Sequence, residues 1–178
     1  MTPGAGLAAA ALAAALAAGP RPAHLECPAG AEHRGAPPPD DGAEWCERRD
    51  LYGHAVREGP ARAWYDDGGL WIEERYREGE RDGPWLEHHR NGRKAREGTY
   101  SRGRKTGRWS VWYESGTCAE EASFREGTLD GPFRAWHENG AKRTEGRYCG
   151  GIQCGPWRTW DDAGRELGSV EFDEVHGP

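Results

Sequence analysis

The chain has 178 residues, enough for one ordinary domain, and its formal charge of −6 gives no general attraction to nucleic acid or anionic membranes. Leu, Ile, Val and Phe total only 18 residues, too little aliphatic mass to cover both faces of a parallel α/β sheet. The 27 Gly disfavour a helical bundle, because Gly costs about 1 kcal/mol per helical position. With nine Trp and six Tyr, this composition favours short strands and tight turns.

The first segment, residues 1–18, carries no charged side chain and contains an Ala/Leu run from Leu7 to Ala18. That length suits a secretory signal peptide and is too short to span a bilayer. We expect export to the periplasm or the extracellular space, with cleavage near Ala17. The alternative is an Ala-rich leader without a targeting role, since the segment lacks Lys and Arg. Lipidation at Cys27 is disfavoured because the bulky Glu26 precedes it.

Residues 19–44 are rich in Pro and lack periodicity, which predicts a stiff polar linker with little ordered structure except near Cys27. Residues 45–58, from Trp45 to Glu58, resemble a degenerate copy of the repeats that follow. We expect this segment to serve as an N-terminal cap.

Five repeats of 24 residues then run without a gap to the end of the chain, at 59–82, 83–106, 107–130, 131–154 and 155–178. Each unit opens on Gly, followed by Pro in four of the five units. A second glycine column marks a turn within each unit: Gly68, Gly92, Gly116, Gly140 and Gly164. An aromatic column closes the second half of each unit: Tyr76, Tyr100, Phe124, Tyr148 and Phe172.

Each unit is predicted to be a β-hairpin. In the fourth unit, an aromatic strand over 133–137 leads into Asn139-Gly140, a strong hairpin signal because both residues accept positive φ. A second strand over 141–148 follows, and residues 149–154 connect to the next unit. The residues flanking these connections are complementary: Arg77 with Asp82, Ser101 with Thr106, Arg125 with Asp130, and Cys149 with Cys154. Successive units should therefore pair. We predict an all-β repeat protein whose tandem hairpins form one elongated antiparallel meander sheet.

One feature conflicts with a flat strand, because the first strand carries aromatic residues three apart, as in Trp109 and Trp112. Either the strand bulges after the opening Gly-Pro, or the first aromatic precedes regular pairing. We favour the second explanation, because Pro marks a strand edge.

The repeated string Tyr-x-x-Gly-x-x-x-Gly-x-Trp-x-x-Trp-x-x-x-Gly, which begins at Tyr100 and recurs with conservative changes from Phe124, resembles the MORN repeat (membrane occupation and recognition nexus), in its bacterial, antitoxin-like variant. The resemblance covers residues 59–178. It implies a scaffold of successive β-hairpins that binds other molecules. A probable leader and five cysteines depart from the pattern of a cytoplasmic antitoxin.

An exported chain permits disulfides. Cys149 and Cys154 flank one inter-unit turn, so we expect them to be bonded, and Cys27 with Cys46 would tie the linker to the cap. Cys118 is then left over. We interpret it as a small side chain in the sheet, the alternative being an intermolecular bridge.

No catalytic motif is evident, and no enzyme activity, cofactor or metal is predicted. His89 and His137 occupy one column but lack carboxylate or thiol ligands at suitable spacing, and we interpret them as surface aromatics replaced by His. The acidic residues occur as adjacent pairs, such as Glu120 and Glu121, whose side chains diverge in a strand.

The sequence favours a non-enzymatic exported scaffold that binds a protein or a glycan through one aromatic sheet face. The candidate residues of that face are Trp64, Trp85, Trp109, Trp112, Trp136, Trp157 and Trp160. The same residues could instead be needed for the fold. Alternative functions are neutralisation of a toxin, as an antitoxin or immunity protein, binding of lipid head groups, or a purely structural role in the envelope. The sequence indicates no nucleic-acid partner and no transmembrane segment in the mature chain, and it leaves the oligomeric state open.

Overall fold

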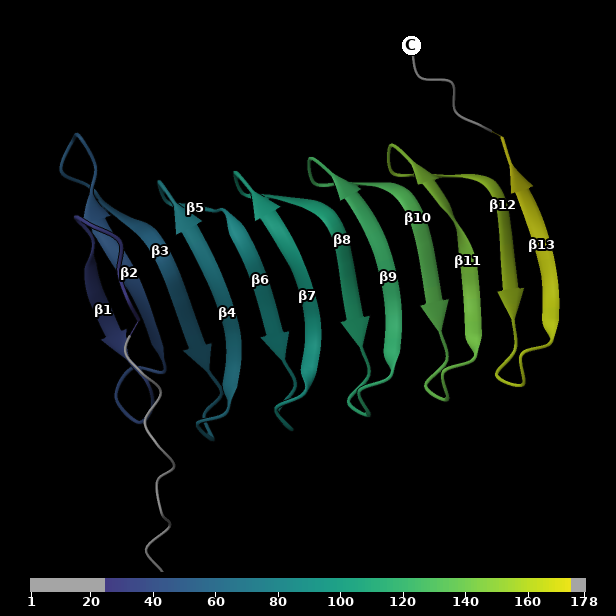
Figure 1. Cartoon of the computed structure of the whole chain (residues 1–178), viewed down its shortest axis with the longest axis horizontal. Helices are drawn as coiled ribbons and strands as arrows, with labels where there is room; N and C mark the ends of the chain where they lie inside the picture. The colour runs from purple at the N-terminus through teal and green to yellow at the C-terminus, as the bar shows by residue number, and fades with distance from the viewer. Residues whose placement is uncertain (1–24, 174–178) are drawn as a thin grey trace, which may run out of the picture.

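The structure, a computed structural model, describes residues 25–173, which fold into one open antiparallel sheet of thirteen strands (Figure 1). The strands pair with one another in chain order, except that β5 pairs only with β4 and lies off the path from β4 to β6. The predicted all-β fold and single antiparallel meander are therefore confirmed. The strands are β1 (Glu32–Ala36), β2 (Ala43–Arg49), β3 (Ala55–Trp64), β4 (Leu70–Arg77), β5 (Glu80–Arg81), β6 (Gly83–His88), β7 (Lys94–Ser101), β8 (Arg104–Trp112), β9 (Cys118–Arg125), β10 (Thr128–Trp136), β11 (Lys142–Cys149), β12 (Ile152–Trp160) and β13 (Glu166–Phe172).

The repeats account for the strands from β3 onwards. β5 and β6 both pair with β4 and are separated only by Asp82, so they form one interrupted strand. The predicted leader of residues 1–18, the cleavage near Ala17 and the last five residues of the fifth unit lie outside the described residues.

The turns between units lie at one end of the strands, at the top in Figure 1, and are shorter than predicted. They have two residues, both with positive φ, as in Glu126 (50°) and Gly127 (87°). This is the geometry of a type I′ turn. In the fourth unit the connection is therefore only Gly150-Gly151, and β12 already begins at Ile152.

The turns within units lie at the opposite end of the strands and differ from the prediction for Asn139-Gly140. The N–H of Gly140 donates to the carbonyl of His137, and the N–H of His137 donates to the carbonyl of Ala141. Gly140 has a φ of 86°, whereas Asn139 is not among the residues with positive φ. The loop is thus a type I turn closed by a left-handed glycine. The type I′ geometry expected here occurs instead in the turns between units.

The explanation favoured for the aromatic spacing is wrong. Trp109 lies inside β8 opposite Ala122, and β8 pairs with β9 without interruption from Gly107 to Val111. The sheet instead bulges on the other side of β8, where the register to β7 shifts between Glu97 and Thr99. A bulge removes regular ladder bonds locally, so the Pro found after the opening Gly in other units fits inside a strand.

The N-terminal part is more ordered than the linker interpretation of residues 19–44 predicts. Residues 32–36 form β1, which pairs with β2. Before it, residues 25–31 form a strap against the sheet, with Leu25 only 8 % exposed. A Cβ at Gly59 would contact Pro28 of this strap. The linker interpretation is therefore wrong for residues 32–36, and it failed because β1 lies outside the repeat.

Candidate binding surface

One face of the sheet, here called the ladder face, carries two clusters of contacting aromatic rings, one from Trp85 to Phe124 and one from Phe133 to Phe172. Their members are Trp85, Tyr100, Trp109, Phe124, Phe133, Tyr148, Trp157 and Phe172. Tyr100 meets Trp109 edge-to-face with 5.1 Å between ring centroids, and Tyr148 meets Trp157 in the same way at 5.1 Å. Edge-to-face pairs contribute about 0.5–1.5 kcal/mol each beyond their buried area. The ladder therefore supplies the stabilisation that a second layer would provide in a sandwich.

Two of the three Trp rings of the ladder, Trp109 and Trp157, lie flat over glycine residues. A Cβ at Gly98 would overlap the indole of Trp109, and one at Gly146 would overlap the indole of Trp157. Ala122 is opposite the Trp109 position and also pairs with Phe133. As a result Trp109 and Trp157 are only 5 % and 6 % exposed although the sheet has one layer. These two Trp side chains stabilise the fold and offer little surface to a partner.

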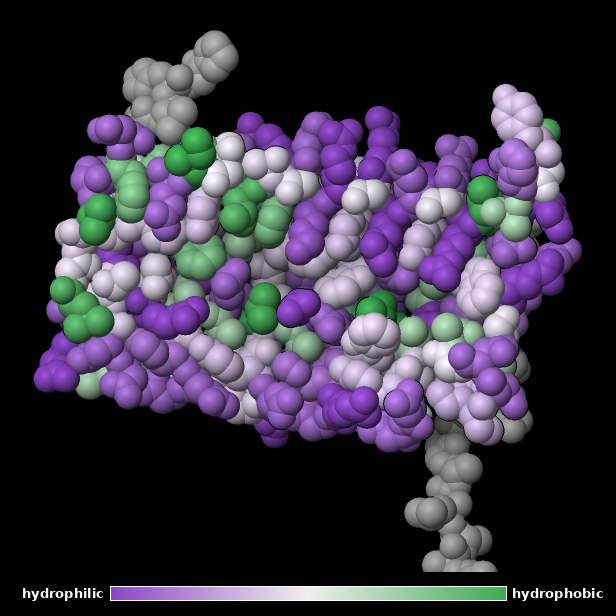
Figure 2. Space-filling model, turned by 180° about the vertical axis from the view of Figure 1, so that it is seen from behind, coloured by the Kyte–Doolittle hydropathy of each residue, from purple (hydrophilic) through white to green (hydrophobic). Residues whose placement is uncertain are grey.

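Cationic side chains cover part of the ladder. The ammonium of Lys105 lies 4.2 Å from the ring centroid of Trp109 and 5.1 Å from that of Phe124. Burial against these rings lowers the pKa of Lys105. Arg57 lies over the rings of Trp45 and Tyr76 in the same manner. Figure 2 shows the ladder face, where hydrophilic residues are interspersed with hydrophobic ones and no continuous hydrophobic patch is visible.

The opposite face, here called the row face, carries a second set of Trp side chains. Side chains alternate along a regular strand, so Trp112 projects from the face opposite to Trp109. Trp136 and Trp160 occupy the same repeat position in β10 and β12. We call Trp112, Trp136 and Trp160 the tryptophan row. All three are partly exposed, in contrast to Trp109 and Trp157.

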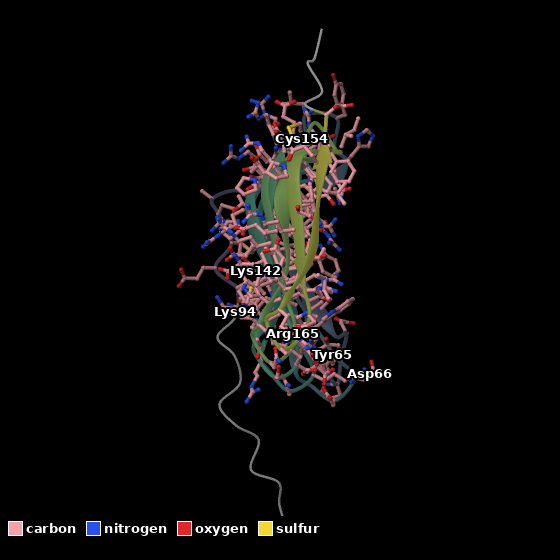
Figure 3. All side chains as sticks on the ribbon, turned by 90° about the vertical axis from the view of Figure 1, so that its right-hand side faces the viewer. Tyr65, Asp66, Lys94, Lys142, Cys154 and Arg165 are labelled. Atoms are coloured by element: carbon pink, nitrogen blue, oxygen red, sulfur yellow. A yellow bond between two sulfur atoms is a disulfide. The ribbon has the colours of Figure 1, made fainter. Side chains whose placement is uncertain are left out.

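Lysines from the intervening strands flank the row. The ammonium of Lys94 lies 5.9 Å from the ring centroid of Trp112, and that of Lys142 lies 5.1 Å from that of Trp160. Both lysines project from the same side of the sheet (Figure 3). Lys142 donates to Glu145 at 2.7 Å and Arg134 donates to it at 3.1 Å, and these bonds hold the pKa of that carboxyl below its ordinary value.

The prediction of a single aromatic binding face is therefore wrong. Trp85, Trp109 and Trp157 belong to the ladder face, whereas the tryptophan row lies on the row face. Trp64 occupies the repeat position of the row but is only 9 % exposed, and the corresponding residue of the next unit is His88. The sequence identifies both sets because they form columns, but a column alone does not show which face it occupies.

Where the turns within units lie, at one end of the strands, side-chain hydrogen bonds join successive units. The hydroxyl of Tyr65 donates to the carbonyl of His88, and the hydroxyl of Tyr113 donates to the carbonyl of Trp136. His89 and His137 use Nε2 for the equivalent bonds to Trp112 and Trp160, at 2.8 and 2.9 Å. His89 and His137 thus replace Tyr in a structural role. Among residues 25–173, no group of three or more His, Cys, Asp or Glu side chains is arranged to hold a metal ion.

Both predicted disulfides, Cys27–Cys46 and Cys149–Cys154, are present. The complementary flanking pairs also meet, since Arg77 contacts Asp82 at 3.5 Å and Arg125 contacts Asp130 at 3.0 Å. These pairs are diagonal neighbours, because Cys149 lies directly opposite Ile152. Cys118 is free and partly buried next to Trp112, and burial raises the pKa of its thiol.

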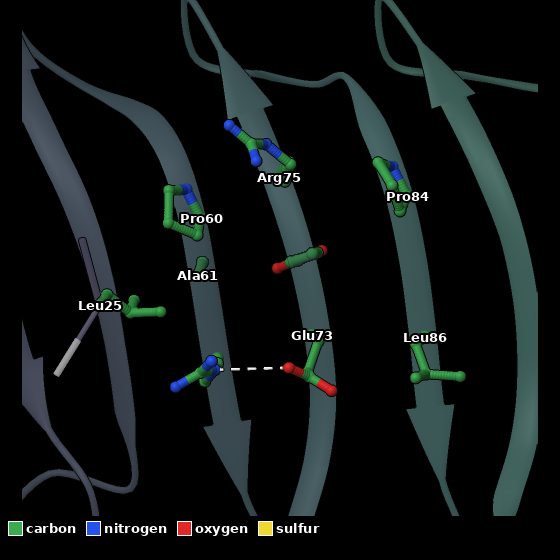
Figure 4. Close-up of a pocket in the computed structure, with 9 residues that line it drawn as sticks. Leu25, Pro60, Ala61, Glu73, Arg75, Pro84 and Leu86 are labelled. Carbon is green, nitrogen blue, oxygen red and sulfur yellow. Dashed lines mark ion pairs between the residues drawn. The ribbon is translucent and has the colours of Figure 1, made fainter. Parts of the chain in front are cut away.

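Sequence analysis missed a groove on the row face near the N-terminal strap (Figure 4). It has a volume of about 250 Å³ and crosses β3, β4 and β6. Leu25 of the strap lies at one end of the groove and Pro84 and Leu86 of β6 at the other, with Pro60 of β3 between them. An ion pair of 3.4 Å between Arg62 and Glu73 lies along one side. No sequence signal identified the groove, because Leu25 lies outside the repeats.

No protein-family model matches the chain, and no curated protein matches it in a sequence search. The described residues contain no helix of the length and apolar character needed to cross a membrane. The two disulfides fit an oxidising, exported environment.

Proposed function

We propose that this chain is an exported, non-enzymatic scaffold of MORN-like repeats that binds an extended glycan along the tryptophan row. Export is supported by the signal-like leader together with the two disulfides. The repeat class is supported by the 24-residue columns and by the uniform docking of successive hairpins.

The observation that carries the proposal is the periodic placement of partly exposed indoles on one face. Trp112, Trp136 and Trp160 lie on alternate strands, which places them about 9.6 Å apart, at about 4.8 Å per strand. This interval is comparable to the length of one disaccharide unit in a linear polysaccharide. A glycan that runs across the strands would therefore present a ring to each indole in turn.

The flanking cations and carboxylates support the same ligand. Lys94, Lys142 and Glu145 lie beside the row and offer hydrogen-bond donors and acceptors to sugar hydroxyls. A flat, polar surface with spaced aromatic rings suits a hydrated polymer better than a compact protein partner, whose interface would have an apolar centre.

The test is affinity electrophoresis of the chain without its leader in gels that contain soluble β-1,4-linked glucan, or chitohexaose and cellohexaose titrations followed by Trp fluorescence. We expect retardation in at least one glycan, reduced in Trp112→Ala, Trp136→Ala and Trp160→Ala and abolished when the three are combined. Trp71→Ala is the matched control, because Trp71 is exposed (38 %) but lies outside the row. Retardation unchanged in the triple variant, or absent with every glycan, would reject the proposal.

A further inference from the structure

Among the described residues, β13 (Glu166–Phe172) is the last strand of the sheet, and its outer side resembles the junction between two units. β13 pairs with β12 on one side and with no other strand among the described residues. At interior junctions, the aromatic of the next unit stacks on the previous one, as Trp109 does on Trp85 at 5.3 Å and Trp157 on Phe133 at 5.5 Å. Beyond Trp157 the ladder ends on Phe172 of β13, 6.4 Å away edge-to-face, and a pocket of about 440 Å³ is lined by Trp157, Val170 and Phe172.

From this edge we infer that β13 accepts an extended strand from another protein, which continues the sheet and inserts an aliphatic side chain beside Trp157. Addition of a strand to an exposed edge is a general mode of peptide recognition. The inference concerns a different surface from the tryptophan row and does not depend on the proposed function.

The choice of an aliphatic side chain follows from the repeat itself. At three of the interior junctions the residue beneath the incoming side chain is matched to it in size: Gly98 lies under Trp109, Ala122 beside Phe133 and Gly146 under Trp157. Val170 occupies this position in the last unit. The larger Val side chain leaves too little depth for an indole, so a Leu, Ile or Val side chain should fit best.

The first unit has Glu74 at this position, and its carboxylate turns aside to bind Arg81 at 2.7 Å. Trp85 above it is accordingly less buried than Trp109. Val170 has no polar group that an ion pair could draw aside in this way. Its side chain therefore limits the size of the incoming side chain.

The edge itself has the features of a binding strand. Leu167 and Val170 are 68 % and 58 % exposed, and β13 contains no Lys or Pro, the residues that commonly protect edges. The opposite edge, β1, has only five residues and adjoins the strap held by Cys27–Cys46.

Charge indicates what else the incoming strand carries. Glu166 and Glu171 of β13 make no ion pair among residues 25–173. Elsewhere on the row face, carboxylates are matched by Arg on the adjacent strand, as Glu145 is by Arg134. A basic segment with alternating aliphatic residues is therefore complementary to β13. A second copy of β13 is disfavoured, because it would bring two acidic strands together.

The experiment uses fluorescein-labelled nine-residue peptides, the length of β12, in which Lys alternates with Val and the central residue is Leu, Trp or Ser. Anisotropy titrations with the chain without its leader should give the tightest binding for central Leu, by about tenfold over central Trp, equivalent to about 1.4 kcal/mol. Replacement of the Lys residues by Glu should abolish binding.

The decisive variant is Val170→Gly, which should reverse the preference so that the central Trp peptide binds more tightly than the Leu peptide. Val170→Lys should abolish binding of both, whereas Ala36→Lys on the β1 edge should leave it unchanged. An unaltered preference in Val170→Gly, or no binding above the Ser peptide, would overturn the inference. So would a dimer in sedimentation that Val170→Lys dissociates, because the occupant of the edge would then be a second copy.

Discussion

The two faces of the sheet use the same residue type for different purposes. Trp109 and Trp112 lie in one strand, three residues apart, and both belong to repeat columns. Trp109 is packed over Gly98 between Tyr100 and Phe124, whereas Trp112 is partly exposed beside Lys94. Recurrence in a repeat therefore does not separate residues that hold the fold from residues that are available to a ligand. The neighbour on the adjacent strand separates them, because only a residue as small as Gly lets an indole lie flat on the sheet.

Filling the space under the ladder should have a large effect on stability. Gly98→Ala places a methyl group within the indole of Trp109 and forces the ring off the sheet, which should cost about 3 kcal/mol of unfolding free energy in urea titrations. Gly69→Ala is the matched control, since Gly69 also lacks a positive φ and its nearest neighbour is the exposed Asp67 carboxylate, at 3.2 Å. Equal stability of the two variants would show that the close packing of Trp109 on Gly98 does not matter.

Removal of the N-terminal disulfide should lower the unfolding free energy by a similar amount. The structural change should be restricted to the end of the row face that the strap covers. Cys27 and Cys46 are 19 residues apart, so the chain-entropy model gives about 3 kcal/mol for this bond, against about 2 kcal/mol for Cys149–Cys154 with its separation of 5. The double Ser variants of each pair should rank in this order in thermal unfolding. The reverse order would show that the strap contributes little.

A smaller loss of unfolding free energy is expected when one of the side-chain hydrogen bonds between units is removed. Tyr113→Phe removes the hydroxyl that donates to the carbonyl of Trp136 at 2.8 Å, which should cost about 1 kcal/mol. Tyr52, in the β2–β3 loop, is 85 % exposed, so Tyr52→Phe should leave the unfolding free energy unchanged. Denaturant unfolding of both variants distinguishes a bond between units from a surface hydroxyl.

The smallest effect is the pH dependence of the row face. Lys142 and Arg134 hold the pKa of Glu145 below its ordinary value of 4.5, so the charged carboxylate stabilises the folded state above that pH. This contribution should be lost as the pH falls below about 4.5 and through the lowered pKa. Glu145→Gln should therefore reduce the slope of stability against pH in acid and leave it unchanged near neutrality. An identical acid slope would show that solvent screens these pairs completely.

Much of the fold follows from the sequence, because the 24-residue spacing of Gly and aromatic residues dictates hairpins of equal size. The turn types were exchanged, since Asn139-Gly140 satisfies the preferences of both a type I′ turn and a type I turn closed by Gly140. The first positions of the type I′ turns carry Glu78, Arg102 and Glu126, residue types that do not predict a positive φ. The adjacent glycine and the bond from its N–H to the preceding unit enforce that conformation, as Gly127 does with Lys105.

The binding surface was predictable only in part. The sequence identified Trp112, Trp136 and Trp160 but combined them with the ladder, because the first aromatic of each unit was expected to precede regular pairing, whereas Trp109 lies inside the regular part of β8. The groove beside Leu25 and the pocket beside Val170 arise where the repeat ends, so no column could reveal them.

The separation of the two faces can be tested with one matched pair of variants, Trp109→Ala and Trp112→Ala, in denaturant unfolding monitored by circular dichroism. Loss of the buried indole of Trp109 should cost about 3–5 kcal/mol. Loss of the partly exposed indole of Trp112 should cost about 1 kcal/mol or less, in line with the small effects of substitutions outside a packed core. Equal destabilisation by the two variants would contradict the assignment of Trp109 to the fold and of Trp112 to the binding surface.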